Sequence, residues 1–593
     1  MCGIIGITGK DTQKIDASKL SLMLASLGKR GPDDKGTLSF PLCTLGQTRL
    51  SIIDLSLGHQ PMRDNKRDMA ITFNGEIYNY RELKKDLEAK GYVFSTNSDT
   101  EVILKAYQEY GDECPKYLDG MFAFAIWDNE KEQLFLARDR FGKKPLYYAF
   151  DKNNNLLVAS EIKALFESGH IKGELDYGAI DNYLTLMYVP PWKSIYKNIH
   201  VISPASKAVY KNSELHIEKY WSIPENPQKP TYEEAKTRIK ELIQMAVKKR
   251  MVADVEVGSL LSGGVDSTLV TYLAQQFMDR PIKTFSVGYQ GSASELPYAR
   301  EASEKIGTDH YTLEIKANLI DELEKITEYM DEPHADSSNF PQHLISELAS
   351  SKVKVALSGD GADELFMGYG WYSKYGNIRK IVQLKNFFFS NQFKEHIKNI
   401  SVFQKNERKK LWKNFGEISD DIVDHAINTI KGNGVRKINF FDLTTYLPGQ
   451  LLYKIDRTSM MHSLEIRSPF LDKDLAEYVY NIPTEYKMNG NQGKIILKDI
   501  LAEIMPKEFV YRRKQGFGAP VKEWLKTETM KKFVLHTLGN NASIYKFLKK
   551  EAVLSMINAF YQKGDDKMYY KIWSLLCLEL WLKSHEKYHR LTV

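Results

Sequence analysis

The amino-acid sequence predicts an α+β domain, followed by an α/β domain with a doubly wound parallel sheet and a helical C-terminal part. In the first third of the chain, turn signals separate short apolar or alternating runs, such as residues 2–8 and 69–77, and helical segments interleave with them. Later, three strand-like runs each precede a helical segment, at residues 255–261, 282–288 and 353–359. Strands that alternate with helices in this way usually form one parallel sheet.

Two predicted helices of the first domain end at glycines. Residues 80–91 and 99–111 are helical in pattern, and Gly91 and Gly111 are typical C-cap residues. The predicted strands around them are CGIIGIT, TLGQTRLSIID, MAITFNGEI, MFAFAIWD and LFLARD.

A proline-rich connector separates the two predicted domains. Prolines recur between residues 188 and 227, where the periodic pattern loosens. A helix then begins after Thr231, which forms a capping-box pattern with Glu234. Because 593 residues are too many for one core, we expect a first domain at residues 2–210 and a second at 228–593.

The composition is that of an ordinary globular protein. The net charge of +6, with 27% charged residues, fits lysine-rich solvated helices better than a nucleic-acid surface. The four cysteines form no C-x-x-C pair, which argues against a zinc site or a disulfide framework. We find no signal peptide and no apolar run long enough for a membrane span. We therefore expect a cytoplasmic protein with neither a membrane span nor a nucleic-acid partner.

The segment SLLSGGVDSTLV joins a predicted strand to a predicted helix. Ser262, Gly263 and Gly264 would let the backbone turn tightly and present N–H groups, and the helix N-terminus adds its positive dipole end. Together these features suit a pyrophosphate, and the carboxylate of Asp266 could ligate Mg²⁺. Many strand–turn–helix units contain glycine and serine, but S-G-G-x-D-S in this position is far more specific.

A second strand end carries VALSGDGADELF. Ligands of open α/β sheets bind at the carboxyl ends of strands, so both motifs would face one pocket, where Asp266 and Asp363 make an Mg²⁺ pair. Taken alone, GDGADE could be an acidic turn that caps a helix. A third strand, FSVGY, would place the backbone of Val287 against an adenine ring, although its pattern fits a plain core strand equally well.

Together, SGGVDS and SGDGADE resemble the ATP-pyrophosphatase domain of glutamine-dependent asparagine synthetases, and KIDRTSMMHSLEIRSPFLD is similar to a long signature of that family. These enzymes adenylate a carboxylate, release pyrophosphate and then admit ammonia. The resemblance implies ATP as a substrate, Lys494 as a contact to the pyrophosphate, and Asp360 as a residue that helps to form and use the acyl-adenylate. The ATP-binding residues that it implies are Leu260, Ser262, Gly263, Gly264, Asp266, Ser267, Val287, Ser358 and Gly359.

The front of the chain resembles class II glutamine amidotransferases, which implies a layered αββα domain of the N-terminal-nucleophile (Ntn) hydrolase type. Removal of Met1 would give Cys2 a free α-amine beside its thiol, so that one residue supplies both nucleophile and base. Without the motifs that follow, a chance cysteine in an edge strand would be the better interpretation.

The resemblance also implies how glutamine is held. Arg49 would clamp its α-carboxylate, and Glu76 and Asp99 would bind its α-ammonium. The side-chain amide of Asn74 and the backbone N–H of Gly75 would form an oxyanion hole. Each of these residues, taken alone, could equally be an ordinary turn or surface residue. All of them, however, occur in the same order along the chain as in the family.

The sequence indicates the type of reaction more clearly than it indicates which carboxylate is amidated. The segment DEPHADSSNFPQHLIS aligns with a region near the acceptor pocket, in a version that some relatives use to amidate sugar acids. We expect aspartate as the acceptor, with another carboxylate, such as a uronic acid in surface polysaccharide synthesis, as the alternative. A tRNA-modifying enzyme would not explain Cys2, and a glucosamine- or purine-pathway amidotransferase would not explain the ATP motifs. We expect an apolar passage that carries ammonia between the two domains. A homodimer is possible.

Overall fold

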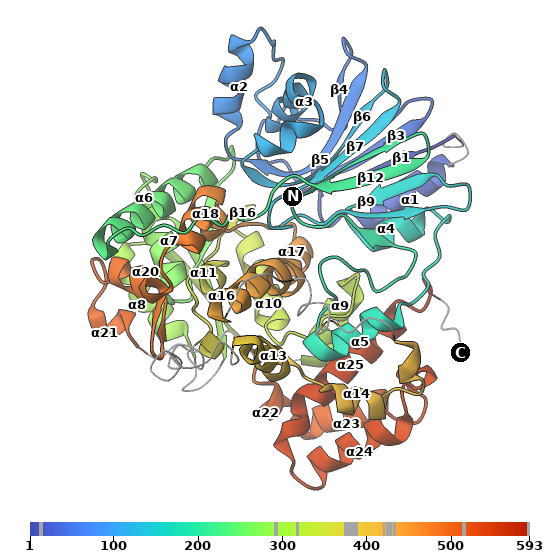
Figure 1. The fold of residues 1–593 in the computed structure, drawn as a ribbon, viewed down its shortest axis with the longest axis vertical. Helices are drawn as coiled ribbons and strands as arrows, with labels where there is room; N and C mark the ends of the chain where they lie inside the picture. Colours follow the sequence, from blue (N-terminus) through green and yellow to red (C-terminus); the bar gives the residue numbers. More distant parts are fainter. Residues whose placement is uncertain are drawn as a thin grey trace.

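The computed structural model contains two layered parts that share a long interface (Figure 1). The structure describes residues 1–10, 16–289, 294–315, 319–372, 389–418, 422, 430, 434–512 and 518–589.

The N-terminal part is a sandwich of two six-stranded antiparallel sheets. The first sheet has the order β10-β8-β9-β1-β3-β2, with bounds His200–Val201, Tyr147–Phe150, Leu156–Ala159, Gly3–Thr8, Cys43–Arg49 and Asp34–Ser39. The second has the order β12-β11-β7-β6-β5-β4, with bounds Glu214–Lys219, Ser206–Lys211, Gln133–Arg138, Gly120–Asp128, Met69–Ile77 and Met62–Asp64. Strands β1 and β5 face each other across the sandwich, whose core includes Ile4, Leu45 and Ala125.

Helices cover both outer faces of this sandwich. Helices α1 (Ala17–Ser26) and α4 (Ile162–Glu167) pack on the first sheet, and α2 (Tyr80–Ala89) and α3 (Asp99–Tyr110) lie on the side of the second (Figure 1). The layer order is therefore αββα, as the resemblance to class II glutamine amidotransferases implies. The predicted boundary at residue 210 falls inside the β11–β12 hairpin, and this sheet continues to Lys219.

The second part is built on a five-stranded parallel sheet with the order β15-β14-β13-β16-β17. The strand bounds are Asp309–Ile315, Lys283–Tyr289, Val257–Leu260, Val355–Leu357 and Glu465–Arg467. The order reverses between β13 and β16, which confirms a doubly wound sheet and defines its switch point. Helix α6 (Tyr232–Arg250) precedes β13. The helices that follow it, up to the loop after β16, are α7 (Val265–Gln275), α8 (Leu296–Ile306), α9 (Leu319–Tyr329), α10 (Asn339–Ser350) and α11 (Ala362–Leu365).

The rest of the chain is mostly helical. A π-helical segment, Asp442–Leu452, runs directly into α17. The other helices are α13 (Phe389–Ile400), α14 (Lys405–Leu411), α16 (Gly434–Phe441), α17 (Tyr453–Met460), α18 (Lys473–Asn481), α19 (Thr484–Lys487), α20 (Ile495–Leu501), α21 (Lys507–Val510), α22 (Val521–Lys526), α23 (Glu528–Thr537), α24 (Lys550–Tyr561) and α25 (Tyr569–Ser584).

The early helix α5 (Tyr177–Leu186) lies among these C-terminal helices, beside α14 and α25 (Figure 1). The hydroxyl of Tyr183 donates to the carbonyl of Ser574 over 2.7 Å, and Arg408 pairs with Asp181 at 2.9 Å. The two halves of the sequence therefore interlock at this end as well. Within the described residues, no helix is both long and apolar enough to cross a membrane.

Candidate active sites

Cys2 lies immediately before β1, in the interface between the two parts. Its backbone N–H donates to Oδ1 of Asn74 over 3.0 Å, and its carbonyl accepts from Nε of Arg30 over 3.1 Å. Burial raises the pKa of the Cys2 thiol, and the nearby N-terminal amine, the Leu50 backbone and Arg49 act against that rise. The thiol therefore needs a base to become a nucleophile.

The two predicted oxyanion-hole residues are neighbours on β5, where Asn74 contacts Cys2. Asn74 lies on β5 and is fully buried, and its Nδ2 has no hydrogen-bond partner among the described residues. At Gly75, φ is 154°, and a Cβ would stand 2.0 Å from the Met121 carbonyl, so a side chain cannot fit there. The predicted pair of oxyanion-hole donors therefore has one orphaned amide and one backbone position restricted to glycine.

The predicted glutamine-binding residues surround the same place. Arg49, at the end of β3, donates from Nη2 to the carbonyls of Ile53 and Asp54 over 3.0 and 2.9 Å. Asp99 accepts from the Ile77 N–H over 3.0 Å, and burial raises its pKa to about 6.

Glu76 makes a contact that the sequence does not predict. Its Oε2 lies 3.4 Å from Nη2 of Arg467 in the second part, next to Glu465. Burial raises the pKa of Glu76 well above its usual value, and the carboxylates of Glu465 and Asp99 add to the rise. Glu76 and Asp99 thus form an acidic surface near the N-terminal amine.

The loop after β13 has the form expected of a phosphate cradle. Gly264 donates its N–H to Oγ of Ser262 over 3.3 Å, and the Ser262 N–H donates to Oγ of Ser267 over 3.2 Å. Gly263 has a φ of 71°, and a Cβ there would lie 2.5 Å from the backbone of Tyr298. This tight turn delivers the chain into the N-terminus of α7, where the helix dipole favours an anion.

The two glycine-containing motifs meet at the switch point of the sheet. A Cβ on Gly359 would stand 2.8 Å from Cβ of Asp266 and 3.0 Å from the N–H of Ser267. The N–H of Ser358 donates to the Arg467 carbonyl over 2.9 Å. The loops therefore form one surface, as the sequence predicts.

Lys494 joins the two predicted metal-binding carboxylates. Its Nζ lies 2.5 Å from Oδ2 of Asp266 and 2.8 Å from Oδ1 of Asp363. Burial would lower the pKa of Lys494, but the two carboxylates raise it above its usual value. The φ of Lys494 is 58°, an uncommon conformation for a residue with a side chain.

The remaining predicted residues lie around this surface. Leu260 and Val287 are buried near the carboxyl ends of neighbouring strands β13 and β14. Asp360 is half-buried. Burial raises its pKa, whereas a hydrogen bond from Ser358 and the charge of Lys454 oppose the rise.

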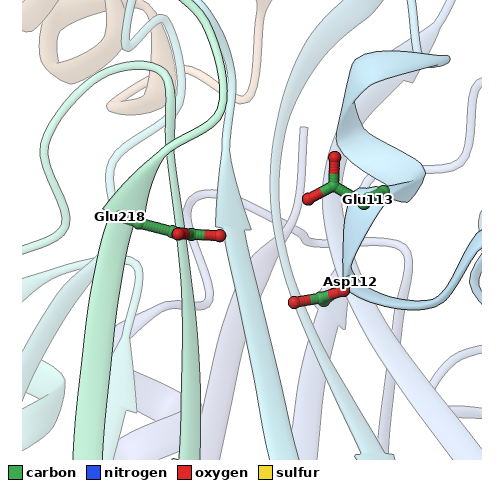
Figure 2. A group of neighbouring side chains, drawn as sticks. All are labelled: Asp112, Glu113 and Glu218. Carbon is green, nitrogen blue, oxygen red and sulfur yellow. The ribbon is translucent and has the colours of Figure 1, made fainter.

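A separate cluster of carboxylates has metal-like spacing but already surrounds a cation. Figure 2 shows Asp112, Glu113 and Glu218, which lie within 4.8 Å of one another in the described part of the chain. Nζ of Lys207 lies 3.2 Å from Asp112 and 2.8 Å from Glu218, and it also contacts Glu113. Because the ammonium occupies the centre of this cluster, we assign it no metal.

Fold and sites together define a two-part amidotransferase, with an Ntn-type sandwich at the front and an ATP-pyrophosphatase sheet behind it. The model of the family described as glutamine amidotransferase domain matches residues 1–221, and that of the family described as asparagine synthase matches residues 238–583. The chain belongs to the asparagine synthase family.

Curated relatives match along nearly the whole chain. Asparagine synthetase [glutamine-hydrolyzing] 1 of Bacillus subtilis (strain 168) is 32% identical and covers 98% of this chain and 96% of its own length. A putative asparagine synthetase [glutamine-hydrolyzing] 2 of Methanocaldococcus jannaschii is 38% identical over 62% of this chain and 76% of its own. A solved PRPP amidotransferase from B. subtilis is 18% identical over 54% of this chain and 67% of its own, with a TM-score of 0.28, too low to support an argument.

Proposed function

We propose that this protein is a glutamine-hydrolysing asparagine synthetase. It would hydrolyse glutamine at Cys2, adenylate aspartate with ATP, and transfer ammonia to give asparagine, AMP and pyrophosphate. The observation that carries this proposal is that one chain assembles both half-sites: Cys2 against Asn74, and Lys494 between Asp266 and Asp363. The names of the full-length relatives agree with it.

At the first site, Cys2 needs a base because burial raises the pKa of its thiol. Burial lowers the pKa of the Met1 amine to about 6. An α-amine on Cys2 in these surroundings would be unprotonated at neutral pH and could take the thiol proton. Nδ2 of Asn74 and the N–H of Gly75 would then stabilise the oxyanion, with Arg49, Glu76 and Asp99 holding the ends of glutamine.

At the second site, the Ser262–Ser267 loop and the N-terminus of α7 would hold the phosphates of ATP, and Leu260, Val287, Ser358 and Gly359 would line the rest of the nucleotide. Asp266 and Asp363 would supply carboxylate oxygens to Mg²⁺ beside the phosphate-binding loop, where the Lys494 ammonium bridges them. When bound, Mg²⁺ would screen the phosphate charges. Lys494 would stabilise the charge that develops on the leaving pyrophosphate, while Asp360 faces the acyl-adenylate.

We propose that ammonia crosses a small cavity between the two parts, with a volume of about 10 Å³. Met1, next to Cys2, and Ser468 both line it, and the Ser468 hydroxyl lies 3.3 Å from that of Ser358 in the adenylation loop. Besides Leu452, Ile455 and Ile466, its lining includes Lys143, Lys144 and Asp456. The predicted passage was apolar, whereas this lining carries three charged side chains.

A location of the protein in the cytoplasm agrees with its cysteines, since all four are free and buried.

A direct assay tests the proposal. The purified protein is incubated with glutamine, ATP, Mg²⁺ and candidate carboxylates, while AMP, pyrophosphate, glutamate and the amide product are followed. We expect pyrophosphate that depends on aspartate, together with asparagine. If aspartate elicits no pyrophosphate, aspartate is not the acceptor.

A further inference from the structure

An arginine that follows α21 contacts the phosphate-binding loop. Nη2 of Arg512 donates to the carbonyl of Gly263 over 2.5 Å, and Nη1 donates to the carbonyl of Phe509 over 2.7 Å. Arg512 and Gly263 are 249 residues apart in the chain. The C-terminal helices therefore make a direct contact with the loop that follows β13.

Two aromatic rings hold this guanidinium in place. Cζ of Arg512 lies 4.0 Å from the ring centroid of Tyr298, on α8, and 4.5 Å from that of Phe509. Helix α8 lies beside α21 (Figure 1). The face of an aromatic ring attracts a cation, more strongly where the cation is shielded from water, and Arg512 is half-buried. The rings thus fix the guanidinium, and the guanidinium fixes the Gly263 carbonyl.

The carbonyl that Arg512 holds belongs to a peptide with unusual freedom. The peptide joins Gly263 to Gly264, and glycine adopts positive and negative φ about equally readily. No other residue fits at Gly263, because its φ is 71° and a Cβ would lie 2.5 Å from the Tyr298 backbone. The tight turn therefore requires the same glycine that leaves the peptide free to rotate.

The orientation of this peptide decides what the loop offers to a phosphate. In a trans peptide, the C=O and the N–H point in opposite directions. With the Gly263 carbonyl turned toward Arg512, the Gly264 N–H points to the other side and donates to Oγ of Ser262 over 3.3 Å, a long bond that a phosphate oxygen could replace. If the peptide flipped, a carbonyl oxygen would face the phosphates and repel them.

We propose that Arg512 is a positioning residue, which keeps the Gly263–Gly264 peptide in the orientation that binds the pyrophosphate end of ATP. It acts through the loop rather than on the nucleotide. Without it, only a fraction of the molecules would present the Gly264 N–H, and the apparent affinity for ATP would fall by that fraction. Saturating ATP would draw the loop back, so kcat would change little. This inference rests on the proposed function and deepens it, because it concerns the site assigned to ATP.

Equilibrium binding of Mg²⁺–ATP and of AMP to the whole protein tests the inference, because AMP lacks the two phosphates that the loop would hold. Arg512→Ala should raise the Kd for ATP at least about tenfold and leave the Kd for AMP near that of wild type. The KM for ATP in AMP formation should rise by the same factor, while kcat stays close to wild type. Arg512→Lys keeps the charge without the planar fork and should recover only part of the affinity.

Further variants separate positioning from misfolding. Tyr298→Leu removes one ring that holds the guanidinium and should raise the Kd for ATP by less than Arg512→Ala does. Arg63→Ala is the matched control, because Arg63 also stacks on a ring, that of Phe40, but lies on the edge strand β4 of the first part. It should leave the binding of both nucleotides unchanged. Glutamine hydrolysis and the thermal midpoint should match wild type in each variant that is compared.

Three outcomes overturn the inference while the proposed function stands. The first is an unchanged Kd for ATP in Arg512→Ala, and the second is an equal loss of affinity for ATP and for AMP, which indicates a general disturbance of the site. The third is a fall in kcat with an unchanged KM for ATP, which assigns Arg512 to the reaction itself. A wild-type protein that binds no ATP would instead refute the proposed function, and this inference with it.

Discussion

Arg30 and Asp456, 426 residues apart in the chain, form a bidentate ion pair across the interface of the two parts. Nη1 and Nη2 of Arg30 donate to the two carboxylate oxygens of Asp456 over 2.8 and 2.9 Å. Nε of the same guanidinium donates to the carbonyl of Cys2. Asp456 also lines the small cavity between the two parts. One arginine thus ties the proposed nucleophile to the helix that carries Lys454.

Asp456→Ala should destabilise the protein and disturb the first site. The variant removes the bidentate partner of the buried Arg30 guanidinium but leaves Glu161, 2.9 Å from Nη1. The loss should therefore lie at the lower end of the about 3–5 kcal/mol that is typical when one partner of a buried ion pair is removed. We expect a lower thermal midpoint at pH 7 and a slower glutamine hydrolysis. Asp474→Ala, which removes an exposed carboxylate, is the matched control and should change neither.

The pH dependence of this pair has a defined sign. Although burial raises the pKa of Asp456, Arg30 and its neighbours lower it below the usual value. The stabilisation is therefore complete above the pKa of an unfolded aspartate, about 3.9, and is lost as the pH falls through the folded value. The difference in thermal midpoint between wild type and Asp456→Ala should be constant from pH 6 to 8 and shrink below pH 4. A difference that grows in acid would contradict this account.

Cys2→Ala should abolish glutamine-dependent amidation, by at least about 1000-fold, because it removes the nucleophile. Ammonia-dependent amidation should survive, since the second site is intact. Cys43→Ala removes another buried thiol, on the neighbouring strand β3, and should retain both activities if the protein folds. Product formation with glutamine and with ammonium chloride measures the two rates. Loss of both rates in a folded Cys2→Ala protein would refute the two-site mechanism.

The active protein should lack Met1. With Met1 present, the nitrogen of Cys2 is an amide that donates to Asn74, and an amide cannot serve as a base. The Met1 side chain is also buried against Tyr78, Met121 and Met460. Intact-mass measurement identifies the N-terminal residue. If some of the sample retains Met1, treatment with methionine aminopeptidase should raise glutamine hydrolysis in proportion, and full activity with Met1 retained would disprove the proposal.

Local signals predicted much of the fold. The capping box of Thr231 and Glu234 is present, and the three predicted strands after it pair in parallel. Strands β15 and β17 were not predicted. β17 has three residues, too few for a periodic signal, and β15 is an edge strand with little buried surface. Their pairing depends on the rest of the sheet, which no local pattern encodes.

The candidate sites likewise contain residues that the sequence predicted and contacts that it did not. Cys2, Asn74 and the two loops lie in motifs with recognisable spacing, and the structure brings each set together. The link from Glu76 to Arg467, by contrast, joins two motifs that each had another interpretation. Nothing in the sequence around Lys143 and Lys144 indicated that they would line a cavity between the parts. Contacts across an interface depend on how whole layers dock, which sequence spacing does not report.

Gly359→Ala should impair ATP use without affecting glutamine hydrolysis. The added Cβ would stand 2.8 Å from Cβ of Asp266, so the two loops would have to separate, and with them Asp266 and Asp363. We expect AMP formation to fall at least about 100-fold, because small misplacements in a preorganised site have effects of this size. Gly416→Ala, at an exposed position with nothing within 4 Å, is the control. Normal AMP formation by Gly359→Ala would show that the loops need not touch.

The two lysines of the cavity should keep the transferred ammonia neutral. Lys143 and Lys144 are both buried, and Nζ of Lys144 lies 4.0 Å from Asp456, whose carboxylate is already paired with Arg30. A lining with excess positive charge repels both hydronium and ammonium, so ammonia that enters it is not protonated and remains a nucleophile.

The double variant Lys143→Gln with Lys144→Gln should therefore yield less amide per glutamate, with normal rates of glutamine hydrolysis and of ammonia-dependent amidation. Burial lowers the pKa of Lys143 to about 7, so its charge, and its share of the exclusion, is present below pH 7 and is lost above it. The deficit of the variant should accordingly be largest near pH 6.5 and shrink toward pH 9, where more of the ammonia is neutral without help. Lys144→Arg keeps the charge and should preserve the wild-type ratio. A deficit that is equal at every pH would assign the lysines a role in packing instead, because only the electrostatic role changes with protonation.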